Sequence, residues 1–378
     1  MHVSRNYVFL GLSITSSWGN GHATTYRGLV KELAKRGHKI TFLERDVPWY
    51  AAHREFSKLP YCDINLYSSL DELKERFTGA VRRADAAVVG SYVPEGIAVG
   101  RWVLSTAKGI PAFYDIDTPV TLSAIREGNC EYLSRDLIRK YKLYFSFTGG
   151  PTLELIEHKF GSPSARALYC SVDPALYFPD KTRKRWDLGY LGTYAADRQP
   201  SLDRLLVQVA GRNPERRFIV AGPQYPKELN WPPNIERIEH LPASHHREFY
   251  NSQRLTLNVT RRDMIRAGYS PSVRLFEAAA CGTAILTDEW PGLRTFFRLG
   301  SEILPVRSTE DVTSHIQMAA DQRLEMAEKA RRRTLRFHTA AVRAEEFERY
   351  VDASLHQFGC SKKRSSVVVE RSPSAALI

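Results

Sequence analysis

Residues 269–289 read Y-S-P-S-V-R-L-F-E-A-A-A-C-G-T-A-I-L-T-D-E, and this stretch decides the fold. Ser270, Pro271 and Ser272 predict the start of a helix, because a hydroxyl can cap the first turn and the fixed φ of proline suits it. The helix runs through the three alanines at 278–280 and ends at Gly282, since glycine tolerates a positive φ. Residues 283–287 then read as a short buried strand.

Two features of this helix have chemical meaning. The free N–H groups and the dipole at its start form an anion site. Arg274 and Glu277 are three residues apart, so a cation and a carboxylate share one face. Such a helix suits a phosphate at its tip and a sugar hydroxyl one turn later. An ordinary amphipathic helix with a solvated Arg–Glu pair is the alternative interpretation.

The composition limits the class of protein. With 378 residues, 43% of them hydrophobic, the chain is long enough for two domains with their own cores. Its net charge of +12 suits an anionic partner. The charges do not form a stripe interleaved with aromatic residues, so we do not expect nucleic-acid binding. No run approaches the roughly 18 apolar residues of a membrane span, which leaves at most a peripheral membrane contact.

The cysteines indicate the compartment. Five cysteines, an odd number without C-x-x-C spacing, argue against both a disulfide framework and a zinc site. They are typical of a protein in a reducing environment, so the sequence predicts a cytoplasmic protein.

The N-terminal half begins with a strand–helix–strand unit. Residues 7–14 and 38–44 read as buried strands, and residues 25–36 as the helix between them. The loop S-S-W-G-N-G-H at 16–22 carries glycines, including Gly21, that can present backbone amides to a ligand. It lacks the G-x-G-x-x-G pattern, so we do not expect a dinucleotide. Further strands and helices alternate up to Cys170, which predicts a doubly wound parallel sheet.

A second alternating series follows a linker near residues 171–185. Strands are expected at 186–192, 217–222, 255–259, 283–287 and 302–306. The chain therefore predicts an α/β fold of two Rossmann-like domains, residues 1–172 and residues 173–330. A helix is expected over 331–358. The Ser-, Lys- and Arg-rich residues 359–378 predict a disordered tail.

Several motifs together resemble a known family. They are V-R-L-F-E-A-A-A-C-G-T-A-I-L-T-D at 273–288, L-N-V-T-R-R-D-M at 257–264, Y-L-G-T-Y-A-A-D-R at 190–198, V-D-P-A-L-Y-F-P at 172–179 and D-E-W-P-G-L-R-T-F-F at 288–297. These resemble the second half of group 1 glycosyltransferases of the CgeB-like type. The first unit, from W-G-N-G-H at 18–22, is similar to that of many GT-B glycosyltransferases.

The resemblance implies two facing domains and a transferase reaction. A nucleotide-diphosphate sugar would be held mainly by residues 173–330. An acceptor, whether a glycan, a small molecule or a protein, would be held by residues 1–172. The helix at 331–358 would cross back to the first domain. No metal is needed structurally, and no cofactor is implied beyond the donor.

One position departs from the family pattern. Many retaining members carry a Glu-x7-Glu pair, whose second Glu accepts hydrogen bonds from the donor ribose. Glu277 fits that second position, but Tyr269 occupies the first. The carboxylate expected near the donor sugar is missing, which leaves retaining and inverting chemistry both open.

The donor-site candidates lie in the second domain and at Gly21. Glu277 is a bidentate acceptor for ribose hydroxyls, while Ser272 and Arg274 lie at the helix start expected to hold phosphate. The remaining candidates follow the first strand of this domain and suit a diphosphate: Gly192, Thr193 and Arg198. A strand-ending turn and a structural Arg–Glu pair are the alternatives.

The catalytic candidates are His22 and Asp117. His22 follows the glycine loop, and its ordinary pKa suits removal of a proton from the acceptor hydroxyl; a capping or buried histidine is the alternative. Asp117 ends a strand at the same edge and suits acceptor binding or base catalysis, or else a turn before Pro119. Asp115-x-Asp117 resembles the metal-binding motif of another glycosyltransferase fold, but we assign no metal ligands.

Two other functions remain open from the sequence. One is a nucleotide-sugar epimerase or hydrolase on the same fold. The other is a catalytically silent sugar-binding or assembly protein, which Tyr269 in place of Glu keeps in consideration.

Overall fold

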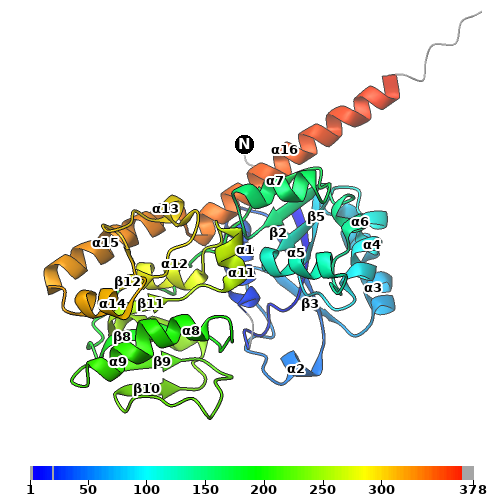
Figure 1. The fold of residues 1–378 in the computed structure, drawn as a ribbon. Helices are drawn as coiled ribbons and strands as arrows, with labels where there is room; N and C mark the ends of the chain where they lie inside the picture. The colour runs from blue at the N-terminus through cyan, green and yellow to red at the C-terminus, as the bar shows by residue number, and fades with distance from the viewer. Residues whose placement is uncertain (1–2, 19–20, 368–378) are drawn as a thin grey trace, which may run out of the picture.

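Two parallel sheets form the two lobes of the molecule (Figure 1). A computed structural model of the chain describes residues 3–18 and 21–367, with side chains described up to residue 357. Every pair of neighbouring strands is parallel. Parallel strands require helical crossovers on both faces, and the alternation of strands and helices in the sequence supplies them.

The first lobe contains a seven-stranded sheet in the order β3-β2-β1-β4-β5-β6-β7. Its strands are β1 (Asn6–Gly11), β2 (Lys39–Arg45), β3 (Asp63–Tyr67), β4 (Ala86–Gly90), β5 (Ile110–Asp115), β6 (Leu143–Ser146) and β7 (Ala165–Ala167). Its helices are α1 (His22–Lys35), α2 (Pro48–Ala51), α3 (Leu70–Arg83), α4 (Gly96–Thr106), α5 (Thr118–Glu127), α6 (Arg135–Ile138) and α7 (Pro151–His158).

Strand β1 shows how this sheet is buried on both faces. Val8 and Leu10 pack with α3 and α4 on one face. Tyr7 and Phe9 alternate with them and pack on the other face, together with α1 and the C-terminal helix. Side chains of a strand alternate between faces, so a continuous apolar run such as this one is suited to a sheet covered on both sides.

The second lobe contains a six-stranded sheet in the order β10-β9-β8-β11-β12-β13. Its strands are β8 (Trp186–Leu191), β9 (Phe218–Ala221), β10 (Ile235–Ile238), β11 (Gln253–Asn258), β12 (Ala284–Thr287) and β13 (Leu304–Pro305). Its helical segments are α8 (Gln199–Leu202), η1 (Asp203–Val207), α9 (Gln208–Arg212), η2 (Ala243–His245), α10 (His246–Asn251), α11 (Arg262–Ala267), α12 (Val273–Ala280), α13 (Leu293–Phe296), α14 (Thr309–Ile316) and α15 (Ala320–Phe337). The predicted pair of Rossmann-like sheets is confirmed.

The chain passes between the lobes at two places that hydrogen-bond to each other. The Val172 amide donates to the His338 carbonyl at 3.0 Å, and the Ala340 amide donates to the Val172 carbonyl at 2.9 Å. This pairing interrupts the C-terminal helix at His338 and Thr339. The helix predicted over 331–358 is therefore two helices, α15 on the second lobe and α16 (Ala340–Val367) on the first.

Helix α16 returns to the first lobe, as predicted. Ala344, Phe347 and Val351 are buried in the same core as Leu29 and Val30 of α1. The helix continues to Val367, so the tail predicted to be disordered from residue 359 is helical up to that residue. A nucleated helix propagates easily, and the sequence has no proline after Ala340 until Pro373. Residues 368–378 lie outside the described residues.

Tyr269 holds the two lobes together through close contact with two glycines. Its amide donates to the Pro291 carbonyl at 2.7 Å, and its own carbonyl accepts from the amide of Gly149 in the first lobe at 3.1 Å. A Cβ atom on Gly150 would lie 2.4 Å from the Tyr269 ring, and one on Gly292 would lie 2.6 Å from it. The tyrosine ring therefore fills a site that only glycine neighbours leave open.

Gly150→Ala tests this contact against Gly128→Ala. Both glycines have positive φ, but a Cβ at Gly128 meets no atom within 4 Å. Gly128→Ala should cost about 1–2 kcal/mol from backbone strain alone. Gly150→Ala should cost about 1–3 kcal/mol more, because the Gly150 ψ of −142° is strained for a residue with a Cβ and because that Cβ also displaces the tyrosine ring. Urea unfolding measures both. Equal losses in the two variants would contradict the proposed packing role of Tyr269.

Two further properties concern the chain as a whole. Within the described residues, no helix has the length and apolar character that crossing a bilayer requires. Cys62, Cys130, Cys170 and Cys281 are free thiols.

Candidate active site

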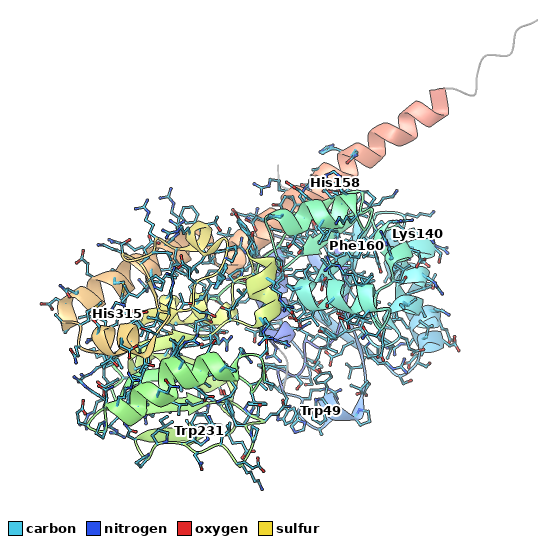
Figure 2. The ribbon with its side chains drawn as sticks, viewed as in Figure 1. Trp49, Lys140, His158, Phe160, Trp231 and His315 are labelled. Carbon is cyan, nitrogen blue, oxygen red and sulfur yellow. The ribbon has the colours of Figure 1, made fainter. Side chains whose placement is uncertain are left out.

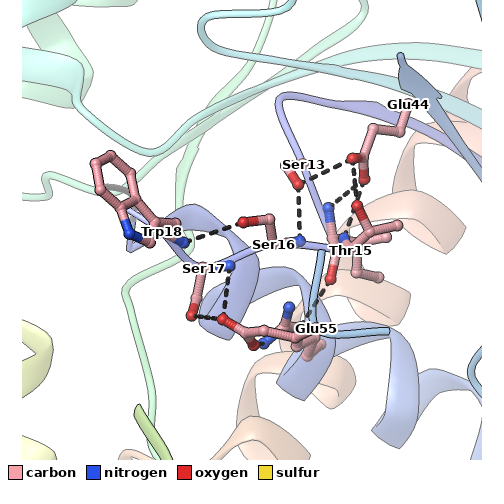
Figure 3. A network of polar contacts seen from close by, with 9 residues as sticks. Ser13, Thr15, Ser16, Ser17, Trp18, Glu44 and Glu55 are labelled. Atoms are coloured by element: carbon pink, nitrogen blue, oxygen red, sulfur yellow. Dashed lines mark hydrogen bonds and ion pairs between the residues drawn. The ribbon is translucent and has the colours of Figure 1, made fainter. Parts of the chain in front are cut away.

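The loop between β1 and α1 is held by a buried carboxylate (Figure 3). Glu44, near the end of β2, is fully buried. Its Oε2 accepts hydrogen bonds from the amides of Ile14 and Thr15 at 2.7 and 3.1 Å, and its Oε1 accepts from the hydroxyls of Ser13 and Thr15 at 3.0 and 2.6 Å. A second carboxylate, Glu55, accepts from the Ser17 amide at 3.1 Å. These bonds fix the path of the chain into α1.

The two predicted catalytic residues lie together at the start of α1. His22 is the first residue of that helix and is 6% exposed. Its Nε2 lies 3.4 Å from Oδ2 of Asp117, the residue before α5. The His22 Nδ1 atom is buried and has no hydrogen-bond partner among the described residues. In the tautomer whose Nε2–H donates to Asp117, Nδ1 carries a free lone pair.

Charged and polar neighbours keep Asp117 ionised. Burial alone would raise its pKa, but the hydrogen bond and charge of His22 outweigh it, with help from the charge of Arg261 and the hydroxyl of Tyr92. The net effect is a pKa of Asp117 below the ordinary value. The Tyr92 ring also lies 5.5 Å from the His22 ring. An ionised Asp117 orients the imidazole and stabilises its protonated form.

Asp115 lies in the interior of the first lobe. It is fully buried, and its carboxylate accepts hydrogen bonds from Tyr144 Oη at 2.5 Å and from Thr121 Oγ1 at 2.7 Å. Burial is the largest effect and raises the pKa of Asp115 to about 6. The described residues contain no group of three or more His, Cys, Asp or Glu that could hold a metal ion.

Asp115 should make stability depend on pH. The folded chain binds the Asp115 proton more tightly than the unfolded chain, whose pKa is near 3.8. Its stabilising contribution is therefore complete below pH ~4 and is lost as the pH rises through about 6. That change in pKa corresponds to about 3 kcal/mol.

Asp115→Asn isolates this effect, because asparagine keeps the shape of the side chain without a titrating proton. Between pH 4 and pH 7, the free energy of unfolding of the natural chain should fall by about 3 kcal/mol relative to the variant. Urea unfolding at several pH values measures the difference. Parallel pH profiles for the two proteins would contradict the raised pKa.

Three arginines of the second lobe lie near one another: Arg198, Arg261 and Arg274. Burial lowers the pKa of Arg198, and the charges of Arg274 and Arg261 lower it further. The Nε atoms of Arg198 and Arg261 are buried, and neither has a hydrogen-bond partner among the described residues. The charge of Arg261 also acts to lower the pKa of Asp117 and that of Tyr92, both in the first lobe. It therefore lies between the arginine pair and the His22–Asp117 pair.

The start of α12 differs from the prediction in its capping. The helix begins at Val273, so Pro271 precedes it and does not occupy the first turn. Ser272 is the N-cap residue, but its hydroxyl makes no capping bond and instead accepts from Arg274 Nε at 2.9 Å. Arg274 Nη1 donates to the Leu191 carbonyl at 2.7 Å. The first-turn amides therefore lack a side-chain cap.

The other predicted phosphate contacts lie beside these arginines. A Cβ atom on Gly192 would lie 2.5 Å from Arg274 Nη1, so only glycine leaves room for that guanidinium. Arg198 Nη2 donates to the Thr193 carbonyl at 2.5 Å, and Thr193 is exposed. Gly21 precedes α1 in the first lobe, where an added Cβ would meet open space. Gly192, Thr193, Arg198, Ser272 and Arg274 thus form one group.

Glu277 lies apart from that group, further along α12. It is 3% exposed and accepts a hydrogen bond from Tyr250 Oη at 3.0 Å. Burial and the charge of Glu277 raise the pKa of Tyr177 in the linker, and His246 Nδ1 lies 4.0 Å from Glu277 Oε2. Arg274 and Glu277 therefore have different surroundings. They do not form the solvated Arg–Glu pair of the alternative interpretation. Tyr177, Tyr250 and His246 therefore surround the Glu277 carboxylate.

The structure places two further residues beside Asp117, Arg261 and Tyr92. From the sequence, the triplet R-R-D at 261–263 could face the donor or simply be solvated, whereas Tyr92 was not selected. Arg261 follows the strand at 253–258, and an arginine at the carboxyl end of a parallel strand was the available signal. Tyr92 has a φ of 61° and follows β4 at the same kind of position. Nothing in the local pattern indicated Tyr92.

Comparison with known proteins identifies the fold. The chain is similar to sucrose-phosphate synthase from Thermosynechococcus elongatus, at 12% identity and a TM-score of 0.66, covering 93% of this chain and 100% of that one. It is also similar to Anabaena Alr3699/HepE in complex with UDP-glucose, at 10% identity and a TM-score of 0.65. That match covers 92% of this chain and 100% of the other one. A third similar structure is alpha-glucosyltransferase in complex with UDP-glucose and DNA containing an abasic site, at 14% identity and a TM-score of 0.68. That match covers 93% of this chain and 100% of the other one. The molecule has the GT-B fold.

The second half of the chain carries the family signature. Residues 198–349 match the family described as glycosyl transferase-like. No curated protein matches the sequence. Residues 198–349 are thus similar to a glycosyl transferase-like domain, in a chain that has the GT-B fold, as the sequence motifs indicated.

Proposed function

We propose that the protein is a glycosyltransferase that moves a hexosyl group from a UDP-sugar to a hydroxyl-bearing acceptor. The observation that carries the proposal is the arginine cluster, in which two buried guanidinium Nε atoms have no partner among the described residues. Buried cations without counter-charges are costly. A diphosphate supplies several acceptor oxygens and negative charge at this place.

The choice of donor rests on structural neighbours. Two of the similar structures contain UDP-glucose, so UDP and UDP-glucose are the first ligands to test. The diphosphate would contact Arg198, Arg261 and Arg274. Glu277, with His246 and Tyr250 beside it, would lie toward the ribose. The expectations that the reaction needs no metal and that the protein is cytoplasmic stay predictions.

The acceptor would react near the His22–Asp117 pair. In this proposal the His22–Asp117 pair takes the proton of the acceptor hydroxyl at its exposed side, the Asp117 carboxylate, because His22 Nδ1 is buried and His22 Nε2 holds that carboxylate in place. The hydroxyl oxygen then forms the new bond to the anomeric carbon, while the bond from that carbon to the UDP oxygen breaks. The arginines stabilise the charge that develops on the leaving diphosphate.

Arginine variants test the donor site. Arg198→Ala and Arg261→Ala should each weaken UDP binding about 10- to 100-fold, since hydrogen bonds to charged groups contribute about 1.5–3 kcal/mol. Arg262→Ala is the matched control, because its side chain is exposed and only its backbone amide bonds to Asp197. Calorimetric titration with UDP measures all three. Unchanged affinity in both cluster variants would refute this donor site.

His22→Ala and Asp117→Asn test the catalytic pair. Each should lower kcat by about 100-fold or more, because base catalysis contributes about that much. UDP affinity should be retained, since neither residue belongs to the arginine cluster. Release of UDP measures turnover in the presence of an acceptor panel. Retained kcat in both variants would remove the base assignment.

Incubation with donor alone separates the alternative functions. An epimerase or hydrolase would convert the UDP-sugar without an acceptor, whereas a transferase would require one. UDP-sugar binding without turnover across the panel would favour a silent sugar-binding protein, the alternative that Tyr269 keeps open.

A further inference from the structure

A basic pocket lies on the outside of the second lobe, between α15 and the loop that precedes β13. Its volume is about 640 Å³, within the range of small-molecule sites. One carboxylate lines it, that of Glu302, together with a hydroxyl, that of Ser301. Five cations also line it: Arg298, Lys329, Arg332, Arg333 and Arg336.

The pocket is separate from the donor site and from the catalytic pair. Ala330 of α15 is buried in the same core as Ala279 of α12, and Arg331 Nε donates to the Ala280 carbonyl at the end of α12 at 3.2 Å. The helix therefore packs with this face on α12, while the pocket cations occupy its other positions. None of the residues assigned to the donor or to proton transfer lines the pocket. In Figure 1, α15 lies along the outside of the second lobe.

The cations of α15 share one face of the helix. They are Lys329, Arg332, Arg333 and Arg336. Their spacing is i, i+3, i+4 and i+7, which brings side chains to one side of a helix. Apolar residues take these positions in an ordinary amphipathic helix, whereas here cations take all four. Like charges at this spacing destabilise a helix, so this face lowers the stability of the fold.

Nearby carboxylates compensate two of the five cations. Lys329 Nζ lies 2.7 Å from Glu325 Oε1, and Arg333 Nε lies 3.5 Å from Glu302 Oε2. The remaining three are exposed and form no ion pair within the described part of the chain: Arg298, Arg332 and Arg336. The pocket therefore has an excess of three positive charges.

A second basic hollow of the same lobe shows a compensated arrangement. It lies at the start of β8 and β11 and has a volume of about 330 Å³. There Asp187 Oδ1 lies 3.2 Å from Nη1 of Arg216 and 3.2 Å from Nη1 of Arg254. The arginines of that hollow share a carboxylate, which the exposed arginines beside α15 lack.

Hydrogen bonds fix both walls of the pocket. Arg333 donates from Nε to the Phe296 carbonyl at 2.6 Å and from Nη2 to the Thr295 carbonyl at 3.1 Å. In the loop, the Glu302 amide donates to the Arg298 carbonyl at 2.9 Å, and the Arg298 amide donates to Glu302 Oε2 at 2.6 Å. The guanidinium of one wall and the backbone of the other are thus held in place before a ligand binds.

We propose that this pocket is a second anion site, which binds a molecule with two or more phosphate groups. A phosphate monoester carries a charge of about −1.5 to −2 near pH 7, so two such groups compensate the three exposed arginines. Guanidinium groups bind phosphate oxygens in pairs, and the Ser301 hydroxyl adds a donor. The proposal does not depend on the proposed transferase reaction.

A soluble phosphorylated molecule and a phospholipid headgroup offer this same chemistry, and two probes separate them. Inorganic tripolyphosphate represents the soluble source, and vesicles that contain cardiolipin, a lipid with two phosphate groups, represent the membrane source. Calorimetric titration measures the first, and co-sedimentation measures the second against vesicles of phosphatidylcholine alone. An ionic strength of about 0.15 M screens distant charges. The natural chain should bind at least one probe saturably.

A triple variant with Arg298→Ala, Arg332→Ala and Arg336→Ala removes the exposed arginines of the pocket. It should weaken binding of the probe about 10- to 100-fold, because exposed ion pairs are weak one by one but three are lost. Arg333 stays unchanged, since it also bonds to two carbonyls of the fold. Urea unfolding should show that the variant is folded.

A matched control removes the same charge elsewhere, with Arg101→Ala, Arg139→Ala and Arg349→Ala. These arginines are exposed and, among the described residues, take part in no ion pair. Arg139 precedes Lys140, which Figure 2 shows at the right-hand edge of the first lobe, across the molecule from α15. The control should bind the probe as tightly as the natural chain.

The donor arginines are a competing place for a phosphate probe. The tripolyphosphate titration is therefore repeated with saturating UDP and with the Arg198→Ala and Arg261→Ala double variant. Binding at the pocket beside α15 should persist in both experiments, whether or not UDP itself binds as proposed.

Three results would overturn the proposal. The first is the absence of saturable binding of both probes to the natural chain. The second is equal affinity of the pocket variant and its matched control, which would reduce the effect to the net charge of +12. The third is loss of binding in the Arg198→Ala and Arg261→Ala double variant, which would assign the anion to the donor arginines.

Discussion

The constraint on which this molecule depends is the meeting, between its lobes, of three arginines that form no ion pair among the described residues. Arg198 and Arg274 come from elements that follow β8 and begin α12, and Arg261 precedes α11. Burial and mutual repulsion lower the pKa of Arg198. A protein gains no stability from such an arrangement. The proposed diphosphate would compensate these three charges.

The remaining architecture serves to place this cluster opposite the first lobe. The two crossings of the chain pair with each other at Val172 and Thr339, and Tyr269 packs against glycines from both lobes. Tyr269 occupies the position where many retaining relatives carry a glutamate. Here that position joins the lobes, with a φ of 47°. The tyrosine at this position, where the sequence resemblance expects a glutamate, therefore has a packing role.

The sequence predicts those parts that depend on local pattern. The strand of residues 284–287, the helix before it and the return of the C-terminal helix follow from apolar periodicity and family motifs. The sequence could predict that His22 lies near Asp117, because both residues follow parallel strands at one edge of the sheet. The sequence offers Arg261 only as a residue that could face the donor or be solvated, and it indicates no role for Tyr92 and Glu44, since those roles arise from contacts between segments far apart. The break at His338 likewise depends on hydrogen bonds to the linker and not on the residues of the helix itself.

A crystal structure of the chain with UDP would show whether the three arginines hold a diphosphate. We expect diphosphate oxygens within hydrogen-bond distance of the guanidinium groups of Arg198 and Arg261, on the side that faces His22 and Asp117. A diphosphate bound elsewhere, with both arginine Nε atoms still without partners, would contradict this expectation.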